Sequence, residues 1–158
     1  MDQLDANIKN PNTKIEVDVP SHLNIFADEV KMQQAFTALL KNAFQAAQVA
    51  LEAWVKITAN ALPGSQQISI QIQDSGSGIK PEVAEKMMIP FFTTKDIGQG
   101  TGLGLSIAKG VFEQHEGQLE YLATEKNTTF NVTLPTTTID LTAASPISIN
   151  SDIPSQAA

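Results

Sequence analysis

GQGTGLGLSIAKG, from Gly98 to Gly110, places five glycines within thirteen residues and continues directly into apolar, helix-forming sequence. Glycine inside a regular element costs about 0.5–1 kcal/mol relative to alanine, so such a cluster indicates a backbone that bends sharply or approaches a ligand closely. The glycines match neither GxxxxGK[ST] nor GxGxxG after a strand. A helix is predicted over 102–115, and the glycines suit a loop whose free N–H groups face an anion at the start of that helix. A flexible loop that merely starts a helix is the simpler alternative.

Composition limits what the chain can be. Its 158 residues, 42% of them hydrophobic, predict one domain with a proper core. The absence of cysteine excludes disulfides and thiolate metal sites, and two histidines give no obvious zinc site. A net charge of −7 argues against a broad nucleic-acid surface. With no long apolar run and no signal peptide, we expect a soluble chain that neither spans nor crosses a membrane.

Hydropathy patterns predict strands and helices in a mixed order. Alternating residues and turn signals predict strands over residues 14–19, 23–26, 54–62, 66–74, 118–124 and 128–135. Helices are predicted from Asp28 to about Leu51, over 81–88 and over 102–115. Because this order is not strict β-α-β alternation, we expect an α/β (α+β) two-layer sandwich, with a mixed, mostly antiparallel sheet covered on one face by helices.

Three further features suit a nucleotide and its cation. Asp74 ends a strand and begins DSGSGI, where a carboxylate can accept a hydrogen bond from an amino group beside a flat ring. Asn42 lies mid-helix, and its amide oxygen suits a hard cation such as Mg²⁺. PFFTTK, at 90–95, is a candidate lid whose Lys95 meets a phosphate. Each feature has an ordinary alternative: a turn, a solvent-facing asparagine, and a loop pinned by aromatic residues beside a solvated lysine.

Together, these features resemble the ATP-binding catalytic domain of bacterial sensor histidine kinases. The resemblance covers about residues 14–135 and rests on NAFQA, DSGSGI, PFFTTK, GTGLGLSIAKGVFEQHEG and TTFNVTLP, in that order. It implies the histidine-kinase-type ATPase (Bergerat) fold, shared with gyrase, heat-shock chaperone and mismatch-repair ATPases. We expect residues 13–135 to form this domain, residues 1–12 to be the remnant of a linker from a dimerisation domain absent from the chain, and residues 136–158 to be a flexible linker or tail.

The resemblance also implies a site. Asn42 would bind Mg²⁺, Asp74 would accept the adenine amino group, and Phe91 and Phe92 would anchor the ATP lid. Lys95 would reach the terminal phosphate. The implied ATP-binding residues are Asn42, Ala46, Asp74, Gly76, Gly78, Ile79, Phe92, Lys95, Gly100, Thr101, Gly102, Leu103, Gly104, Leu105 and Thr129. Within this set, Gly100 to Leu105 would wrap the phosphates through backbone amides, and Thr129 would support Asp74 or the adenine.

Two departures from the family bear on function. Ala38 replaces the asparagine, or the general-base glutamate of related ATPases, one turn before Asn42, which argues against autonomous ATP hydrolysis and for weaker metal binding. Neither His22 nor His115 suits a phosphoacceptor, and both are expected to be structural or surface residues. The implied function is to bind Mg–ATP and donate its γ-phosphoryl group to a histidine on the dimerisation domain, with a response regulator downstream. The isolated chain would then bind ATP without phosphorylating itself. The resemblance also implies a cytoplasmic location, whether or not the parent protein is anchored in the inner membrane. Alternatives are a stand-alone ATPase or anti-sigma-type serine kinase, and a non-catalytic nucleotide-sensing module.

Overall fold

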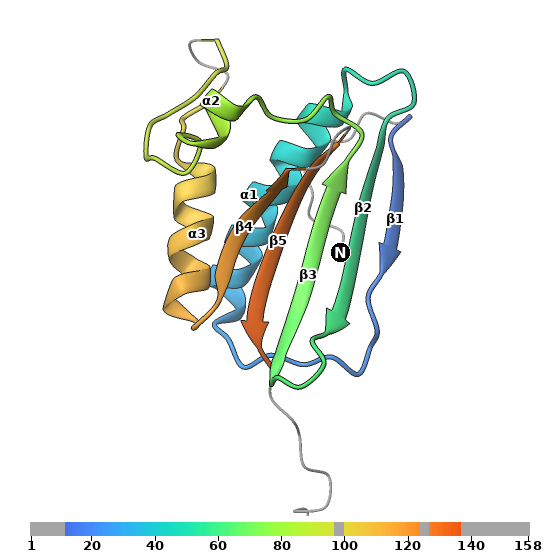
Figure 1. The fold of residues 1–158 in the computed structure, drawn as a ribbon, viewed down its shortest axis with the longest axis vertical. Helices are drawn as coiled ribbons and strands as arrows, with labels where there is room; N and C mark the ends of the chain where they lie inside the picture. The colour runs from blue at the N-terminus through green and yellow to red at the C-terminus, as the bar shows by residue number, and fades with distance from the viewer. Residues whose placement is uncertain (1–11, 97–99, 124–126, 137–158) are drawn as a thin grey trace, which may run out of the picture.

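A five-stranded sheet with helices on one face forms the architecture of the computed structural model, which describes residues 12–96, 100–123 and 127–136 (Figure 1). The strands are β1 (Lys14–Asp18), β2 (Trp54–Ala61), β3 (Gln67–Asp74), β4 (Gln118–Ala123) and β5 (Thr128–Pro135). Their spatial order is β1-β2-β3-β5-β4, with β1 parallel to β2 and every other pair antiparallel. This arrangement confirms the predicted mixed, mostly antiparallel sandwich.

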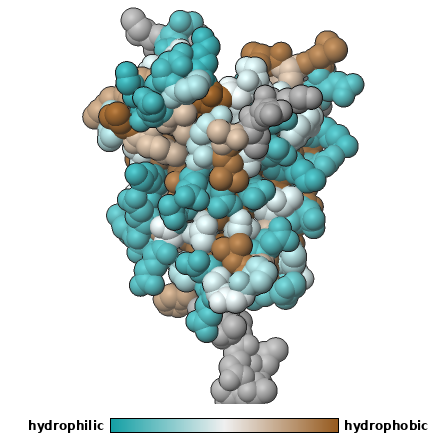
Figure 2. All heavy atoms as spheres, viewed as in Figure 1, coloured by the Kyte–Doolittle hydropathy of each residue, from teal (hydrophilic) through white to brown (hydrophobic). Residues whose placement is uncertain are grey.

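The helices are α1 (Glu29–Ala47), α2 (Pro81–Ala84) and α3 (Gly104–Gln114). Alternation along β3 turns Ile68 and Ile72 toward α1, where both are buried. Phe36 of α1 meets Phe112 of α3 edge to face, with ring centroids 5.2 Å apart. Burying a side chain of this size stabilises the fold by about 1.5–3 kcal/mol. The hydrophobic core therefore lies between the two helices and the sheet. The opposite face of the sheet is mostly hydrophilic (Figure 2).

Some predicted elements differ from the structure. Residues 23–26 form no strand; they are an extended connection in which Leu23 and Ile25 pack against the core, which explains their alternation. The alternation of residues 14–19 is typical of a half-buried strand, but β1 is exposed at all five positions, because α1 packs over β2 and β3 and α3 packs over β4. Helix α1 ends at Ala47 instead of near Leu51, and α2 is only four residues long.

Other sequence predictions concern residues at the ends of the chain. Those for residues 1–12 and 136–158 fall almost entirely outside the described residues, so the proposed linker and tail stay predictions. Among the helices of the described ranges, none is long and apolar enough to cross a bilayer.

His115 ties the end of α3 to the start of α1. Its Nε2 accepts a hydrogen bond from the backbone N–H of Asp28 at 3.1 Å, which leaves Nδ1 to donate to the Val111 carbonyl at 2.8 Å. Asp28 in turn caps α1, its carboxylate accepting from the Lys31 N–H at 3.1 Å. Nε2 of His115 therefore joins the end of α3 to the start of α1, while Nδ1 fixes the ring against α3 itself, so His115 has a structural role. His22 is exposed.

We expect His115→Ala to lower the free energy of unfolding by about 1–2 kcal/mol, because it leaves the Asp28 N–H and the Val111 carbonyl without their partner. Urea denaturation would measure the change. The matched control is His22→Ala on the exposed connection, for which a change within about 0.5 kcal/mol is expected. Equal effects of the two substitutions would show that the hydrogen bonds of the His115 ring contribute nothing to stability.

Candidate functional site

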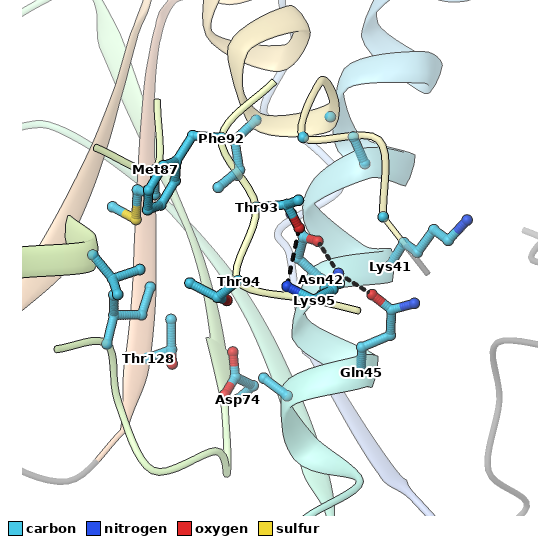
Figure 3. A pocket seen from close by; sticks show the side chains of 18 of the residues that line it. Lys41, Asn42, Gln45, Asp74, Met87, Phe92, Thr93, Thr94, Lys95 and Thr128 are labelled. Carbon is cyan, nitrogen blue, oxygen red and sulfur yellow. Dashed lines mark hydrogen bonds between the residues drawn. The ribbon is translucent and has the colours of Figure 1, made fainter. Parts of the chain in front are cut away.

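A cleft of about 600 Å³ lies between α1, the end of β3, the segment around α2 and the loop that precedes α3 (Figure 3). It brings together most of the side chains and glycines predicted from the sequence. Those that line it are Asn42, Ala46, Asp74, Gly78, Ile79, Phe92, Lys95, Gly100, Thr101, Gly102, Gly104 and Leu105. Gly76, Leu103 and Thr129 do not line it.

Asp74 is the buried charge of the cleft, with 1% of its surface exposed. It is the last residue of β3, and its Oδ1 accepts a hydrogen bond from the Gly76 N–H at 2.8 Å. Burial raises the pKa of the carboxyl to about 6, although the hydrogen bonds from Gly76 and the Thr128 hydroxyl oppose this shift. A largely desolvated acceptor of this kind is strong and directional toward a donor that enters the cleft.

Thr128, not Thr129, supports Asp74. Thr128 is paired with Asp74 across the β3–β5 ladder, lines the cleft and hydrogen-bonds the carboxylate. Thr129 is paired with Gln73, and its Oγ1 is buried without a hydrogen-bond partner. Because neighbouring residues of a strand point to opposite faces, a one-residue step along β5 decides which threonine faces Asp74. The expected role of Thr129 toward the adenine stays a prediction.

Gly76 does not line the cleft but lies against two residues that do, Asp74 and Ala46. A Cβ at this position would lie 2.7 Å from the Asp74 Oδ1 and 3.1 Å from the Cβ of Ala46 on α1. Glycine therefore lets the chain that leaves β3 pass between its own carboxylate and the helix. The predicted role of Gly76 in shaping the pocket thus acts through Asp74 rather than through contact with the cavity.

The loop between the phenylalanines and α3 is closed by a backbone contact. The Phe91 N–H donates to the Gly102 carbonyl at 2.9 Å, and both residues have a φ of 67°. A Cβ on Gly102 would lie 2.5 Å from the Phe91 carbonyl carbon, so only glycine fits this approach. Phe92 packs against the core and lines the cleft, whereas the Phe91 side chain is 75% exposed. Of the two predicted ring anchors, therefore, Phe91 anchors the loop through its backbone alone.

Lys95 reaches across the cleft to α1. Its Nζ donates to the Asn42 Oδ1 at 3.3 Å and also to the Gln45 Oε1 (Figure 3). Its backbone N–H donates to the Thr93 hydroxyl at 3.1 Å, which holds the loop in a tight turn. Burial lowers the pKa of the Lys95 ammonium, and the charge of Lys41 lowers it further. Half-buried Asn42 thus turns its amide oxygen toward a cation at the cleft.

Sequence reasoning missed several residues that line the cleft, and helical periodicity could have found the one that shares a face of α1 with Asn42. Gln45 lies three residues after Asn42, and Ala38, which the sequence had already singled out, lies four residues before it, so all three share one face of α1 and line the cleft. Val49 lines the cleft just beyond the end of α1 at Ala47. Lys41 lines it as well. Thr93, Thr94 and Met87 come from the segment around α2, where no periodic pattern indicates which side chains turn inward.

Comparisons with known proteins agree with this geometry. Residues 27–138 match the family described as Histidine kinase-, DNA gyrase B-, and HSP90-like ATPase. Sensor kinase CckA of Brucella abortus (strain 2308) is 43% identical over 82 residues, which are 51% of this chain and 9% of CckA. The chain therefore spans less than a tenth of the length of that relative.

Solved structures give the same result. The catalytic domain of histidine kinase ThkA is 30% identical with a TM-score of 0.68, and the match covers 82% of each chain. Full-length ShkA, solved in complex with AMPPNP, is 25% identical with a TM-score of 0.67, covering 80% of this chain and 26% of ShkA. These matches confirm the resemblance and the fold class that the sequence predicted.

Gly102→Ala is expected to destabilise the protein by about 1–3 kcal/mol, because its Cβ would collide with the Phe91 backbone and its φ is positive. Urea denaturation measures this. Gly110→Ala, in α3 with nothing within 4 Å of the added Cβ, is the control and is expected to stabilise by about 0.5–1 kcal/mol. A neutral Gly102→Ala would mean that the loop does not depend on this contact.

Asp74→Asn is expected to raise the free energy of unfolding at neutral pH. In the folded protein the pKa of the carboxyl is about 6, above its usual 3.8. Below about pH 4 the group is protonated in both the folded and the unfolded state, so this shift does not affect stability; between about pH 4 and pH 6 the shift lowers the free energy of unfolding progressively. The stability difference between variant and wild type should therefore grow over this range to on the order of 1–3 kcal/mol. Urea denaturation at several pH values measures it. Asp18→Asn on exposed β1 is the control, and a pH-independent difference for Asp74→Asn would contradict this cause.

Proposed function

The chain belongs to the histidine kinase-, DNA gyrase B- and HSP90-like ATPase family as an ATP-binding catalytic domain of the sensor kinase type, and we propose that it binds Mg–ATP in this cleft and donates the γ-phosphoryl group to a histidine of a dimerisation domain. One observation carries the proposal. A buried carboxylate, a cation held by amide oxygens and a glycine loop at the start of α3 surround a single cleft. These three parts suit, in turn, the base, the metal and the phosphates of ATP.

The base would be recognised by Asp74. The carboxylate keeps its position through the Gly76 N–H, and the adenine amino group would donate to it. Gly78 and Ile79 line the same cleft, and the Ile79 N–H donates to the Tyr121 hydroxyl at 3.3 Å, which fixes the position of this segment. Because a buried acceptor left without a donor is costly, a ring without an amino group would bind less well.

The phosphates would lie against the start of α3. Gly100, Gly102 and Gly104 line the cleft immediately before or at the first residue of that helix. Free backbone N–H groups and the positive end of the helix dipole attract anions at such a position. Lys95 would add a side-chain charge for the terminal phosphate.

The donor set of the cleft fits a hard cation. Amide oxygens of Asn42 and Gln45 both accept from the Lys95 ammonium, which stands where a cation is stabilised. Mg²⁺ prefers such oxygen ligands together with waters and substrate phosphates. Within the described ranges, no three His, Cys, Asp or Glu side chains are grouped so that they could hold a metal ion, so the phosphates of the nucleotide would have to supply further ligands. When bound, Mg²⁺ would neutralise phosphate charge during transfer.

Ala38 favours transfer over hydrolysis. It lines the cleft one turn before Asn42, and its Cβ would be 3.6 Å from a Cβ at Gly104. No acidic side chain is available there to activate a water molecule. Positioning and charge neutralisation would then account for the chemistry, with the nucleophile supplied by the phosphoacceptor histidine.

Calorimetric titration of the purified chain with ATP, with Mg²⁺ and with EDTA, tests the proposal. We expect Asp74→Asn to weaken binding at least tenfold in both conditions, equivalent to about 1.4 kcal/mol. Asn42→Ala should weaken it mainly with Mg²⁺. Asn60→Ala, at the exposed end of β2, is the control and should bind like the wild type.

Two outcomes would point elsewhere. ATP binding without phosphoryl transfer to the dimerisation domain of the parent protein would favour a nucleotide-sensing module. Sustained ATP turnover by the chain alone would favour a stand-alone ATPase.

A further inference from the structure

Two amide oxygens on one face of α1 are directed at a single positive charge. Asn42 and Gln45 are three residues apart, which places their side chains side by side on the helix surface. The Lys95 Nζ lies 3.3 Å from the Asn42 Oδ1 and also donates to the Gln45 Oε1. An ammonium group only donates hydrogen bonds, so both amides must present their oxygens to it.

From this geometry we propose that Gln45 is a second metal-binding residue, and that Lys95 and the divalent cation compete for the oxygens of Asn42 and Gln45. The proposal rests on the metal site of the proposed function and adds a ligand and a displaced group to it. Ala38 offers no oxygen on the other side of Asn42, so Gln45 supplies the second amide oxygen of this helix face. An ammonium and a divalent cation cannot share that position, because like charges at contact distance repel strongly.

The exchange links the metal to the loop. Lys95 belongs to the segment that the Phe91–Gly102 backbone contact closes, and Thr93 also holds it. With Asn42 and Gln45 holding the cation, Lys95 would no longer donate to their oxygens and would be free to pair with the phosphates of the nucleotide. The same lysine therefore occupies the metal position before binding and neutralises phosphate charge afterwards.

The surrounding charges oppose binding of the cation alone. Lys41 lines the same cleft, and its charge acts on Lys95. Asp74 is the carboxylate of the cleft, but it is engaged by Gly76 and Thr128. A divalent cation without phosphates would thus have to displace one lysine and remain near another. Wild-type protein should bind it weakly until nucleotide is present.

Binding of Mn²⁺ alone, followed by electron paramagnetic resonance of the free ion in the absence of nucleotide, tests the competition. Lys95→Met is expected to bind Mn²⁺ about five- to tenfold more tightly than wild type, because it frees both oxygens. Lys41→Met is the control: it removes the same charge from the same cleft, but Lys41 donates to neither amide. An equal gain in both variants would overturn the proposal, since charge alone would then explain it.

Gln45 is tested in the Lys95→Met background. Adding Gln45→Leu should return Mn²⁺ affinity to the wild-type level or below, whereas adding Gln71→Leu on β3, outside the cleft, should leave the gain intact. Retained affinity in Lys95→Met/Gln45→Leu would show that Gln45 is not a ligand. Urea denaturation confirms that each variant is folded. Because no nucleotide is used, a failure of ATP binding is a separate result from a failure of this competition.

Discussion

The close approach of α1 to the end of β3 is the constraint on which the site depends. At Gly76 the chain passes between the Asp74 carboxylate and Ala46, where a Cβ would lie 2.7 Å from one and 3.1 Å from the other. Small residues on this face of α1, such as Ala43 and Ala47, are buried at the same interface. A larger residue at any of these points would move the helix away from the sheet and separate the two walls of the cleft.

This packing makes the site costly to maintain. Burial raises the pKa of Asp74, so its ionised form weakens the fold at neutral pH. The loop closed between Phe91 and Gly102 holds a non-glycine residue at positive φ and leaves a large aromatic ring in solvent. Such departures from a relaxed structure concentrate at sites of binding or reaction, because contacts with the bound ligand offset the destabilisation.

Lys95 connects the two halves of the cleft. It extends from the loop to the amide oxygens of Asn42 and Gln45, so the metal wall and the phosphate wall are joined by one side chain. The expected phosphate-binding role of this lysine and its observed place beside Asn42 are compatible if it moves when nucleotide and cation enter. Motions of a loop side chain of this kind are fast compared with catalysis.

The sequence by itself determined the family, through the resemblance of its ordered motifs to sensor kinases. It also determined the fold class and many of the residues that line the cleft, because glycine spacing, strand alternation and a mid-helix asparagine each reflect local backbone chemistry. Tertiary structure decided what depends on register and on contacts between distant segments. Thr128 rather than Thr129 supports Asp74 through the pairing of β3 with β5, and β1 is exposed because none of the helices in the described part of the chain packs over it. Gln45 and Lys95 share a position only because the loop folds back onto α1. Local patterns specify which elements form, whereas only their packing specifies which side chains meet.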